Sequence, residues 1–227
     1  MVSNSVLGSK ANTSVTLSLV IAVSLTLGFV ALTTAESVWP ALIFTVVGMV
    51  LGCYALAKLR PQRLGLSPPH VMLSLGFGGM LIGLLIDIHM TPIVVIAGIC
   101  STSQNLSLFD SLKLHIALMP YMHIGMLIGG ILAIPSLRFL TPECRKLCSM
   151  LTQNILCSGW MLLGMTLGAI AFTQLLQSQD SAMSLSLMLG GMFTGMVWGM
   201  VLSVFLYRQY FSLRDSLEAA RLARSGR

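Results

Sequence analysis

Charged side chains are scarce in this sequence. Lys, Arg, Asp and Glu make up only 9% of the 227 residues, against about a quarter of the residues in an ordinary soluble domain. A water-soluble fold of this length could not cover its surface with so few charges. Apolar residues make up 56% of the chain, and they fall in blocks of about twenty, the length that a helix needs to cross a hydrocarbon core. The sequence therefore predicts an integral membrane protein.

The chain also lacks the short motifs that mark common enzyme chemistry. It contains no Gly-x-Ser-x-Gly, no His-Glu-x-x-His, no phosphate-binding loop and no dinucleotide fingerprint. Its five cysteines are an odd number without paired spacing, which argues against a disulfide framework. Cys144 and Cys148 are one helical turn apart and could bind a metal, but no His or second cysteine pair accompanies them. No motif indicates a cofactor, and the sequence does not favour an enzyme.

Six apolar blocks predict a bundle of six transmembrane helices, an all-α integral membrane fold. Their expected limits are residues 14–34, 38–58, 70–90, 114–137, 150–175 and 184–207. The first block lacks a short apolar region followed by a cleavage site, so we expect it to be retained as a helix. The chain then divides into an N-terminus (1–13), a six-helix transmembrane domain (14–207) and a basic tail (208–227) that lies against anionic lipid headgroups.

Positive charges in alternate loops predict the orientation of the helices, because Lys and Arg near helix ends are retained in the cytoplasm. The loops and tail rich in these residues hold Lys58, Arg60, Arg63, Arg138, Arg145, Lys146, Arg208, Arg214, Arg221, Arg224 and Arg227. The other loops hold Glu36, Asp110, Lys113 and Asp180. We expect both termini in the cytoplasm of a bacterial cell with the protein in its inner membrane. Topology accounts for the net charge of +6, so the bilayer, and not a nucleic acid, is the expected partner.

Five of the six blocks carry a Gly-Met-x-x-Gly string near their midpoints. The glycines are Gly48 and Gly52, Gly79 and Gly83, Gly125 and Gly129, Gly164 and Gly168, and Gly195 and Gly199. Residues four apart share a helix face, so each pair forms a notch in which another helix backbone can approach closely. We interpret the glycines as helix-packing sites, either within this chain or against membrane-protein partners or a second copy.

The spacing of these strings suggests an internal repeat. The strings of blocks two and five are 116 residues apart, and so are those of blocks three and six. The chain can therefore be read as two halves, 14–90 and 114–207. Because each half has three spans, the second would enter the membrane with the opposite orientation, as in many transporters. Chance similarity between helices built from Gly, Met, Leu and Ala is the alternative.

Polar side chains gather on the outer parts of the third and fourth blocks. Asp87 and His89 end the third block, whereas His115, Met119 and His123 follow one another at spacings of four in the fourth. Ionisable groups at membrane depth are costly and are functional candidates by default. Imidazole and thioether suit copper or another late transition metal, with Met161, Met165, Met192, Met196 and Met200 as a further supply. A carboxylate beside imidazole suits a proton relay, and purely structural roles remain open.

Two prolines mark irregular backbone near this cluster. Pro120 removes a backbone donor one turn inside the fourth block, which predicts a kink between His115 and His123. Pro92 precedes an apolar stretch, residues 93–100, that is too short to cross the membrane. We expect that stretch to be a re-entrant or interfacial segment over the outer end of the cluster.

The predicted function is the movement of a small solute or ion across the membrane. Asp87, His89, His115, Met119 and His123 are the candidate contacts for that solute, with His115, Met119 and His123 as the candidate metal ligands. A non-catalytic subunit or scaffold of a larger membrane complex is the alternative, because the glycine notches could receive helices of other proteins. A cavity that reaches the polar cluster would favour transport, and a solid bundle with notches on its rim would favour the scaffold.

Overall fold

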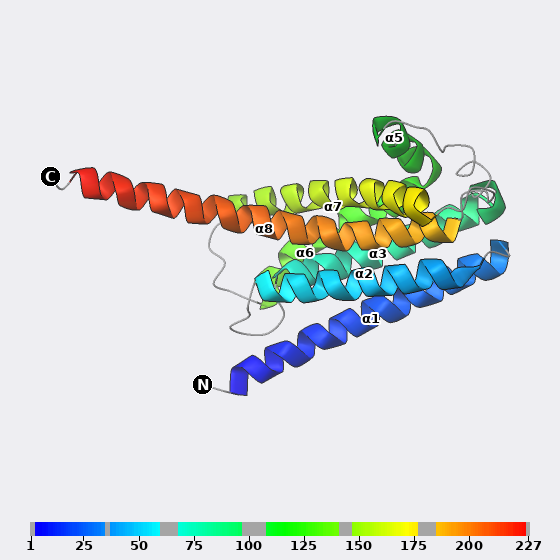
Figure 1. Ribbon diagram of the computed structural model, residues 1–227, viewed down its shortest axis with the longest axis horizontal. Helices are drawn as coiled ribbons and strands as arrows, with labels where there is room; N and C mark the ends of the chain where they lie inside the picture. The colour runs from blue at the N-terminus through cyan, green and yellow to red at the C-terminus, as the bar shows by residue number, and fades with distance from the viewer. Residues whose placement is uncertain are drawn as a thin grey trace.

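The structure is a computed structural model that describes residues 3–34, 37–59, 68–96, 108–140, 147–176 and 185–225. These residues are almost entirely helical, and none of them forms a strand. The helices are α1 (Ser3–Thr34), α2 (Val38–Leu59), α3 (Pro68–Met90), α5 (Leu108–Leu118), α6 (Pro120–Leu140), α7 (Leu147–Leu176) and α8 (Leu185–Ser225) (Figure 1).

Five helices are long and apolar enough to cross a membrane, and a bent pair makes a sixth candidate. The five candidate spans are Thr13–Thr34, Val38–Leu59, Pro69–Met90, Asn154–Phe172 and Leu185–Arg214. They overlap five of the six predicted blocks, which confirms the prediction of a multi-pass helical protein. Several sequence features lie outside the described residues: Glu36, Arg60, Arg63, residues 97–100, Cys144, Arg145, Lys146, Asp180 and Arg227.

The fourth block differs from the single span predicted over 114–137. The chain breaks at Met119, and the helical segments Leu112–Leu118 and Pro120–Ser136 are bent by 95°. A bend near Pro120 was expected from its missing amide hydrogen, but its size makes α5 and α6 two separate helices. Figure 1 shows α5 turning away from the bundle, so α6 alone continues through it.

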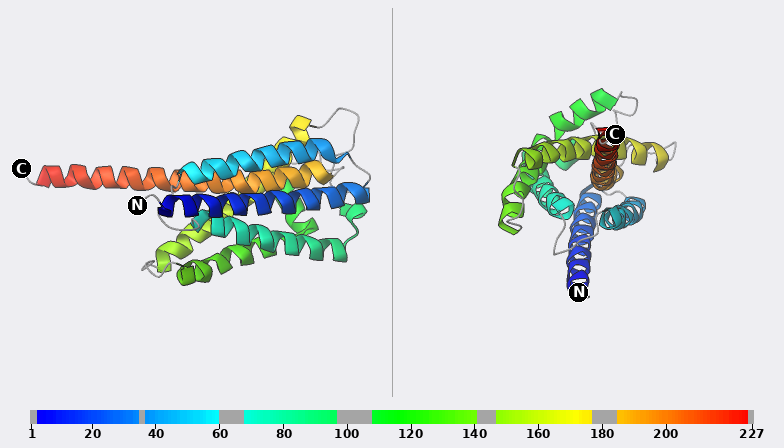
Figure 2. Two further views of the ribbon diagram at one scale, coloured as in Figure 1. Left: turned by 90° about the horizontal axis from the view of Figure 1, so that it is seen from below. Right: turned by 90° about the vertical axis from the view of Figure 1, so that its left-hand side faces the viewer.

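The helices pack as two tight antiparallel pairs with two further helices beside them. α3 lies along α6 and α7 lies along α8, while α2 packs on α8 and α1 lies mainly against α2 (Figures 1 and 2). Both chain ends lie at one end of the bundle, here called the terminal end, and α5 lies at the opposite broken-span end (Figure 1). The tail beyond residue 208 continues α8 out of the bundle without a break.

The α3 and α6 backbones meet through glycine. A Cβ atom built at Gly79 would overlap the carbonyl oxygen of Gly125, and one built at Gly125 would overlap the carbonyl oxygen of Gly79. Gly83 faces the backbone of Tyr121 in the same way, and Gly129 faces that of Leu75. No side chain can move aside at these positions, because the opposing atoms belong to the main chain.

A similar contact joins α7 to α8. Cβ atoms at Gly164 and Gly195 would each overlap the other residue's carbonyl oxygen, and Gly168 faces the backbone at Gly191. At the next turn Gly199 faces the carbonyl oxygen of Trp160. The two helices therefore share three turns of direct backbone contact.

The glycines of α2 meet side chains instead of backbone. A Cβ at Gly48 would lie 2.6 Å from Cγ2 of Thr194, and one at Gly52 would lie 2.6 Å from Cγ1 of Val197. The α7 glycines thus face α8. In the predicted repeat α2 corresponds to α7 and α3 to α8, so the α2 glycines would face α3, but they face α8 instead. The structure does not confirm the two predicted halves, because this pairing differs between them.

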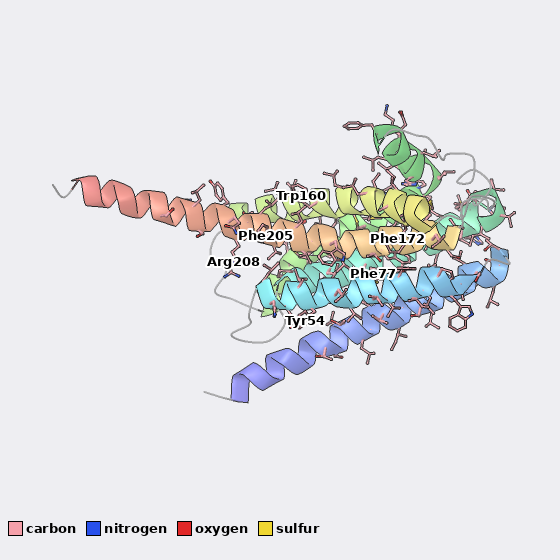
Figure 3. All side chains as sticks on the ribbon, in the orientation of Figure 1. Tyr54, Phe77, Trp160, Phe172, Phe205 and Arg208 are labelled. Carbon is pink, nitrogen blue, oxygen red and sulfur yellow. The ribbon has the colours of Figure 1, made fainter. Side chains whose placement is uncertain are left out.

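Methionine is the most frequent residue type among the buried apolar side chains of the bundle. Phe77 on α3, labelled in Figure 3, is fully buried, as is Phe193 on α8, and the centroids of the two rings are 5.3 Å apart. At the terminal end, Arg208 Nη1 donates to the carbonyl oxygen of Leu59 at 3.2 Å. This bond ties the end of α2 to the part of α8 that leaves the bundle.

Candidate functional site

Asp87 lies in the last turn of α3 and is only 3% exposed. Its carboxylate accepts hydrogen bonds from the backbone amides of Tyr121 and Met122, at 3.2 and 2.7 Å. Those amides belong to the first turn of α6, which begins at Pro120. Asp87 therefore caps the N-terminus of a helix from which it is separated by more than thirty residues.

The break in the fourth span creates the need for this cap. The first amides of any helix have no partner inside the helix, and in a membrane they cannot turn to water. A carboxylate satisfies such amides and also interacts favourably with the positive end of the helix dipole. The anionic residue that the sequence singled out thus has a defined structural task at the break.

His123 lies one turn into α6, beneath this cap. Its ring Nδ1 donates to the carbonyl oxygen of Met119 at 2.8 Å, an acceptor that the break leaves within reach. The imidazole is 5% exposed and lies near enough to the Asp87 carboxylate for an electrostatic interaction. His123 therefore joins the last residue before the break to the first turns after it.

His115 approaches the break from α5. It is 5% exposed, and its Nδ1 is a buried atom without a hydrogen-bond partner among the described residues. It interacts electrostatically with His123, and Met119, four residues later, is fully buried. The fold thus brings Asp87, His115, Met119 and His123 together, and we call these four residues the break cluster.

His89 does not belong to the break cluster. It is exposed in the last turn of α3, two residues beyond Asp87, and successive helical positions point in directions about 100° apart. Of the apolar stretch after Pro92, the described residues include Ile93 and Ile96, which are buried at this end of the molecule.

A group of buried methionines lies deeper in the bundle. Met161 and Met196 direct their Cε methyl groups to Gly76, where a Cβ atom would lie 3.3 and 3.6 Å from them. The spacing of four in the sequence pointed to part of this group. Met80 and Met188 are equally buried but were not among the predicted residues. Met188 has a methionine four residues later, whereas Met80 has none at that spacing.

A second polar group lies toward the terminal end, and the sequence analysis missed it. Asn154 Nδ2 donates to the carbonyl oxygen of Gly130 at 2.5 Å, and Ser158 Oγ donates to Asn154 Oδ1 at 3.4 Å. Cys157 Sγ and Ser203 Oγ are 3.1 Å apart. The spacing of four between Asn154 and Ser158 was a signal in the sequence, but only the contacts between helices bring in Gly130 and pair Cys157 with Ser203.

Two apolar grooves lie over the glycine contacts. The groove over α3 and α6, about 430 Å³, includes Gly78, Gly79 and Tyr121 in its lining, and the groove over α7 and α8, about 310 Å³, includes Trp160 and Phe172 (Figure 3). Neither groove is lined by a residue of the break cluster or by His89. Both therefore belong to the apolar rim and not to the polar site, which is the arrangement expected of a scaffold and not that of a cavity leading to the cluster.

A metal site made only of His, Cys, Asp and Glu side chains is not found among the described residues. Among the residues that the structure describes, no three His, Cys, Asp or Glu side chains gather as they would around a metal ion. Comparison with protein-family models, with curated proteins and with solved structures finds no match to this chain.

Proposed function

We propose that this protein moves a small ion across the membrane and that the break cluster is the site where the ion enters the protein. The observation that carries the proposal is the position of the break: a span that could have been continuous is interrupted where an aspartate and two histidines are buried. Discontinuous helices of this kind form the ion and substrate sites of many transporters.

The energetics of the cluster support this proposal. Buried ionisable groups are costly in a bilayer and are retained mainly where they serve a pathway or a site. Asp87 offsets part of that cost by capping α6. His115 has no comparable hydrogen bond at Nδ1, which is buried without a partner in the described part of the chain. An imidazole nitrogen with a free position is a ligand or a proton acceptor.

The proposal includes an orientation in the membrane. Among the cations in the described residues, Lys58 and Arg208 lie at the terminal end and Lys113 lies on α5 at the other end. The loop cations flank the helices that end at the terminal end. We therefore assign the terminal end, with both termini, to the cytoplasm of a bacterial inner membrane. The break cluster then faces the outside. The two halves 14–90 and 114–207 are not required, since the route proposed below uses α3, α6, α7 and α8.

Ion uptake into proteoliposomes tests the proposal. The full chain is reconstituted, and uptake of H⁺, Na⁺, K⁺, Zn²⁺ and Cu⁺ is followed separately with ion-specific dyes. We expect one of these ions to enter, and we expect His115→Ala to reduce its initial rate by about tenfold or more, as the loss of a site ligand would. His89→Ala is the matched control, because His89 is exposed beside the cluster.

Two results would contradict this proposal. One is the absence of protein-dependent uptake of every ion from vesicles that contain folded protein. The other is equal uptake by the wild type and by His115→Ala, which would show that the buried imidazole has no part in the route.

A second candidate function is a scaffold role, and the grooves favour it. The groove over α3 and α6 is apolar, it is lined in part by Gly78, and a Cβ atom added at Gly78 would meet no atom within 4 Å. We therefore expect Gly78→Leu to place its side chain in the groove and not between the two helices. If a partner helix occupies it, a complex resolved on a native gel should fall to the size of the free protein, while Gly159→Leu, on an open face of α7, should leave it intact.

A further inference from the structure

We infer that the ion is a soft, thiophilic monovalent cation of the Cu(I) class, carried through the bundle by buried methionine thioethers. This inference rests on the proposed function and names its cargo. The route would begin at His115, Met119 and His123 and continue between α3, α6, α7 and α8 toward the terminal end.

Methionine is sorted in this protein in a way that hydrophobicity does not explain. Twelve of the thirteen methionines whose side chains the structure describes are at most 5% exposed: Met49, Met72, Met80, Met119, Met122, Met126, Met161, Met165, Met188, Met192, Met196 and Met200. Met90 is the exception at 66%. Most of the described isoleucines instead lie on the outer surface, where nine are at least 42% exposed.

In a water-soluble protein the hydrophobic effect would account for the burial of methionine, but in a bilayer this driving force is largely absent. Lipid tails are as apolar as leucine or isoleucine, so burial in the bundle gains little from the hydrophobic effect. Methionine differs from those residues in two properties, its flexible unbranched chain and its polarisable sulfur. Flexible packing explains buried methionine in general, so the inference depends on which methionines lie together and on which helices they lie.

The methionines form a continuous series along α8. Met188, Met192, Met196 and Met200 are four residues apart, and each is at most 1% exposed. Three such steps span about 18 Å, which is more than half of a hydrocarbon core of about 30 Å. All four therefore lie along one buried face of α8, so their thioethers form one row of soft ligands through the bundle.

Neighbouring helices supply soft ligands at matching levels. On α7, Cys157, Met161 and Met165 repeat the spacing of four and are all buried. The Cε atoms of Met161 and Met196 meet at Gly76 of α3, where the absence of a side chain leaves room for both. Thioethers from two helices therefore lie side by side near the middle of the bundle, opposite the backbone of α6 at Met126.

The chemistry of these ligands selects the ion. Thioether, thiol and imidazole are soft or borderline ligands that favour Cu(I), whereas Mg²⁺, Ca²⁺ and Mn²⁺ favour oxygen. A cation bound by sulfur sheds its hydration shell, so its route does not need to be filled with water. This accounts for a site whose four residues line neither of the two described grooves. The ion keeps its charge and oxidation state as it passes from one set of ligands to the next.

Replacement of sulfur by methylene tests the inference directly. The full chain is produced in a methionine auxotroph with norleucine, which keeps the length and flexibility of methionine but has no sulfur. The probe is Ag(I), which has the ligand preference of Cu(I) and is not oxidised in air. We expect purified wild-type protein to bind Ag(I) and to show metal–sulfur scattering in X-ray absorption, and we expect the norleucine protein to lose both. The selenomethionine protein is the matched control and should retain binding.

Point variants keep the test decisive if the norleucine protein does not fold. Met161→Leu with Met196→Leu preserves the apolar volume at Gly76, and it should weaken Ag(I) binding by about tenfold. Met90→Leu, on the outer surface, should leave the affinity unchanged. Equal Ag(I) affinity in the wild type and in the folded norleucine or double-leucine protein would overturn the inference.

The two proposals can fail separately. If His115-dependent uptake of H⁺, Na⁺, K⁺ or Zn²⁺ is found while Ag(I) does not bind, the proposed function stands and the cargo inferred here is wrong. If Ag(I) binds through sulfur but no ion crosses the vesicle membrane, the methionine site stands and transport is wrong.

Discussion

The carboxylate of Asp87 accepts a hydrogen bond from the backbone amide of Met122, at 2.7 Å, and so joins the end of α3 to the beginning of α6. The same two helices meet farther along through the backbones of Gly79 and Gly125. The pair is therefore fixed at two levels, by a charged cap at one end and by glycine contact nearer the middle. Each level can be tested by changing one side chain.

Asp87 should contribute to stability as a helix cap. Asp87→Ala removes both acceptor oxygens from the first turn of α6, and we expect the free energy of unfolding to fall by about 1–2 kcal/mol. Asp87→Asn keeps one carbonyl oxygen that can accept from Met122, so it should retain most of that stability. Thermal unfolding in detergent measures both variants. Equal losses in Ala and Asn would show that the charge, and not the cap, stabilises the end of α6.

Adjacent glycines on α3 should respond in opposite ways to the same substitution. A Cβ at Gly79 would overlap a backbone carbonyl, whereas a Cβ at Gly78 would meet nothing within 4 Å. We therefore expect Gly79→Ala to lower the free energy of unfolding by about 1–3 kcal/mol through overpacking, and Gly78→Ala to leave it unchanged or slightly higher. If both variants unfold at the wild-type temperature, α3 and α6 do not approach this closely.

The contact between Gly48 and Thr194 should be repairable, because the opposing atom belongs to a side chain. Gly48→Ala would bring its Cβ to 2.6 Å from Cγ2 of Thr194, and we expect a loss of about 1 kcal/mol. Thr194→Ser removes that methyl group, so the double variant should recover most of the loss in a double-mutant cycle. Additive losses would mean that the two side chains do not meet. Gly195→Ala, which faces backbone, is the control that Thr194→Ser should not rescue.

The helices themselves were predictable from the sequence because a bilayer imposes their length and their apolar character. Val38–Leu59 and Pro69–Met90 differ by about one residue from the predicted limits. The bend at Pro120 was also predictable, since proline removes a backbone donor. Its size was not, because whether α5 continues α6 depends on the cap that Asp87 supplies from another helix.

The choice of partner for each glycine notch could not be predicted. All five strings have the same spacing, yet Gly164 faces backbone on α8 and Gly48 faces a threonine side chain. The Gly-x-x-x-Gly spacing specifies that one face of each helix is flat, but which neighbouring helix packs on that face depends on how all the helices are arranged. For the same reason the sequence singled out Asp87, His89, His115 and His123 as one group but could not tell which of them would be buried together, and the structure leaves His89 exposed.

The orientation of the protein can be tested with reporters at two positions. We expect a reporter fused after Arg227 to be active in the cytoplasm, because cations flank the helix ends at the terminal end. A tag inserted near Gln104, in the segment that follows α3, should react with an antibody added outside spheroplasts. The reverse labelling at either position would remove the proposed assignment of the break cluster to the outer side.

Two constraints hold α5 and α6 apart, the proline at position 120 and the cap that Asp87 supplies. Restoration of the missing amide by Pro120→Ala should not straighten the chain, because Asp87 still binds the amides of the first turn of α6. Removal of both constraints, in Pro120→Ala with Asp87→Ala, allows those amides to bond to the carbonyl groups of α5 and so to form one continuous helix.

Distances between spin labels at Lys113 and Ile131, both exposed, separate these states. A straight helix would place the two backbones about 27 Å apart, at about 1.5 Å per residue, whereas the 95° bend shortens this to about 20 Å by the same helical rise. We expect the shorter distance in the wild type and in Pro120→Ala, and the longer one in the double variant. A long distance in Pro120→Ala alone would make proline the cause of the break. A short distance in the double variant would show that contacts of α5 with the rest of the bundle maintain it.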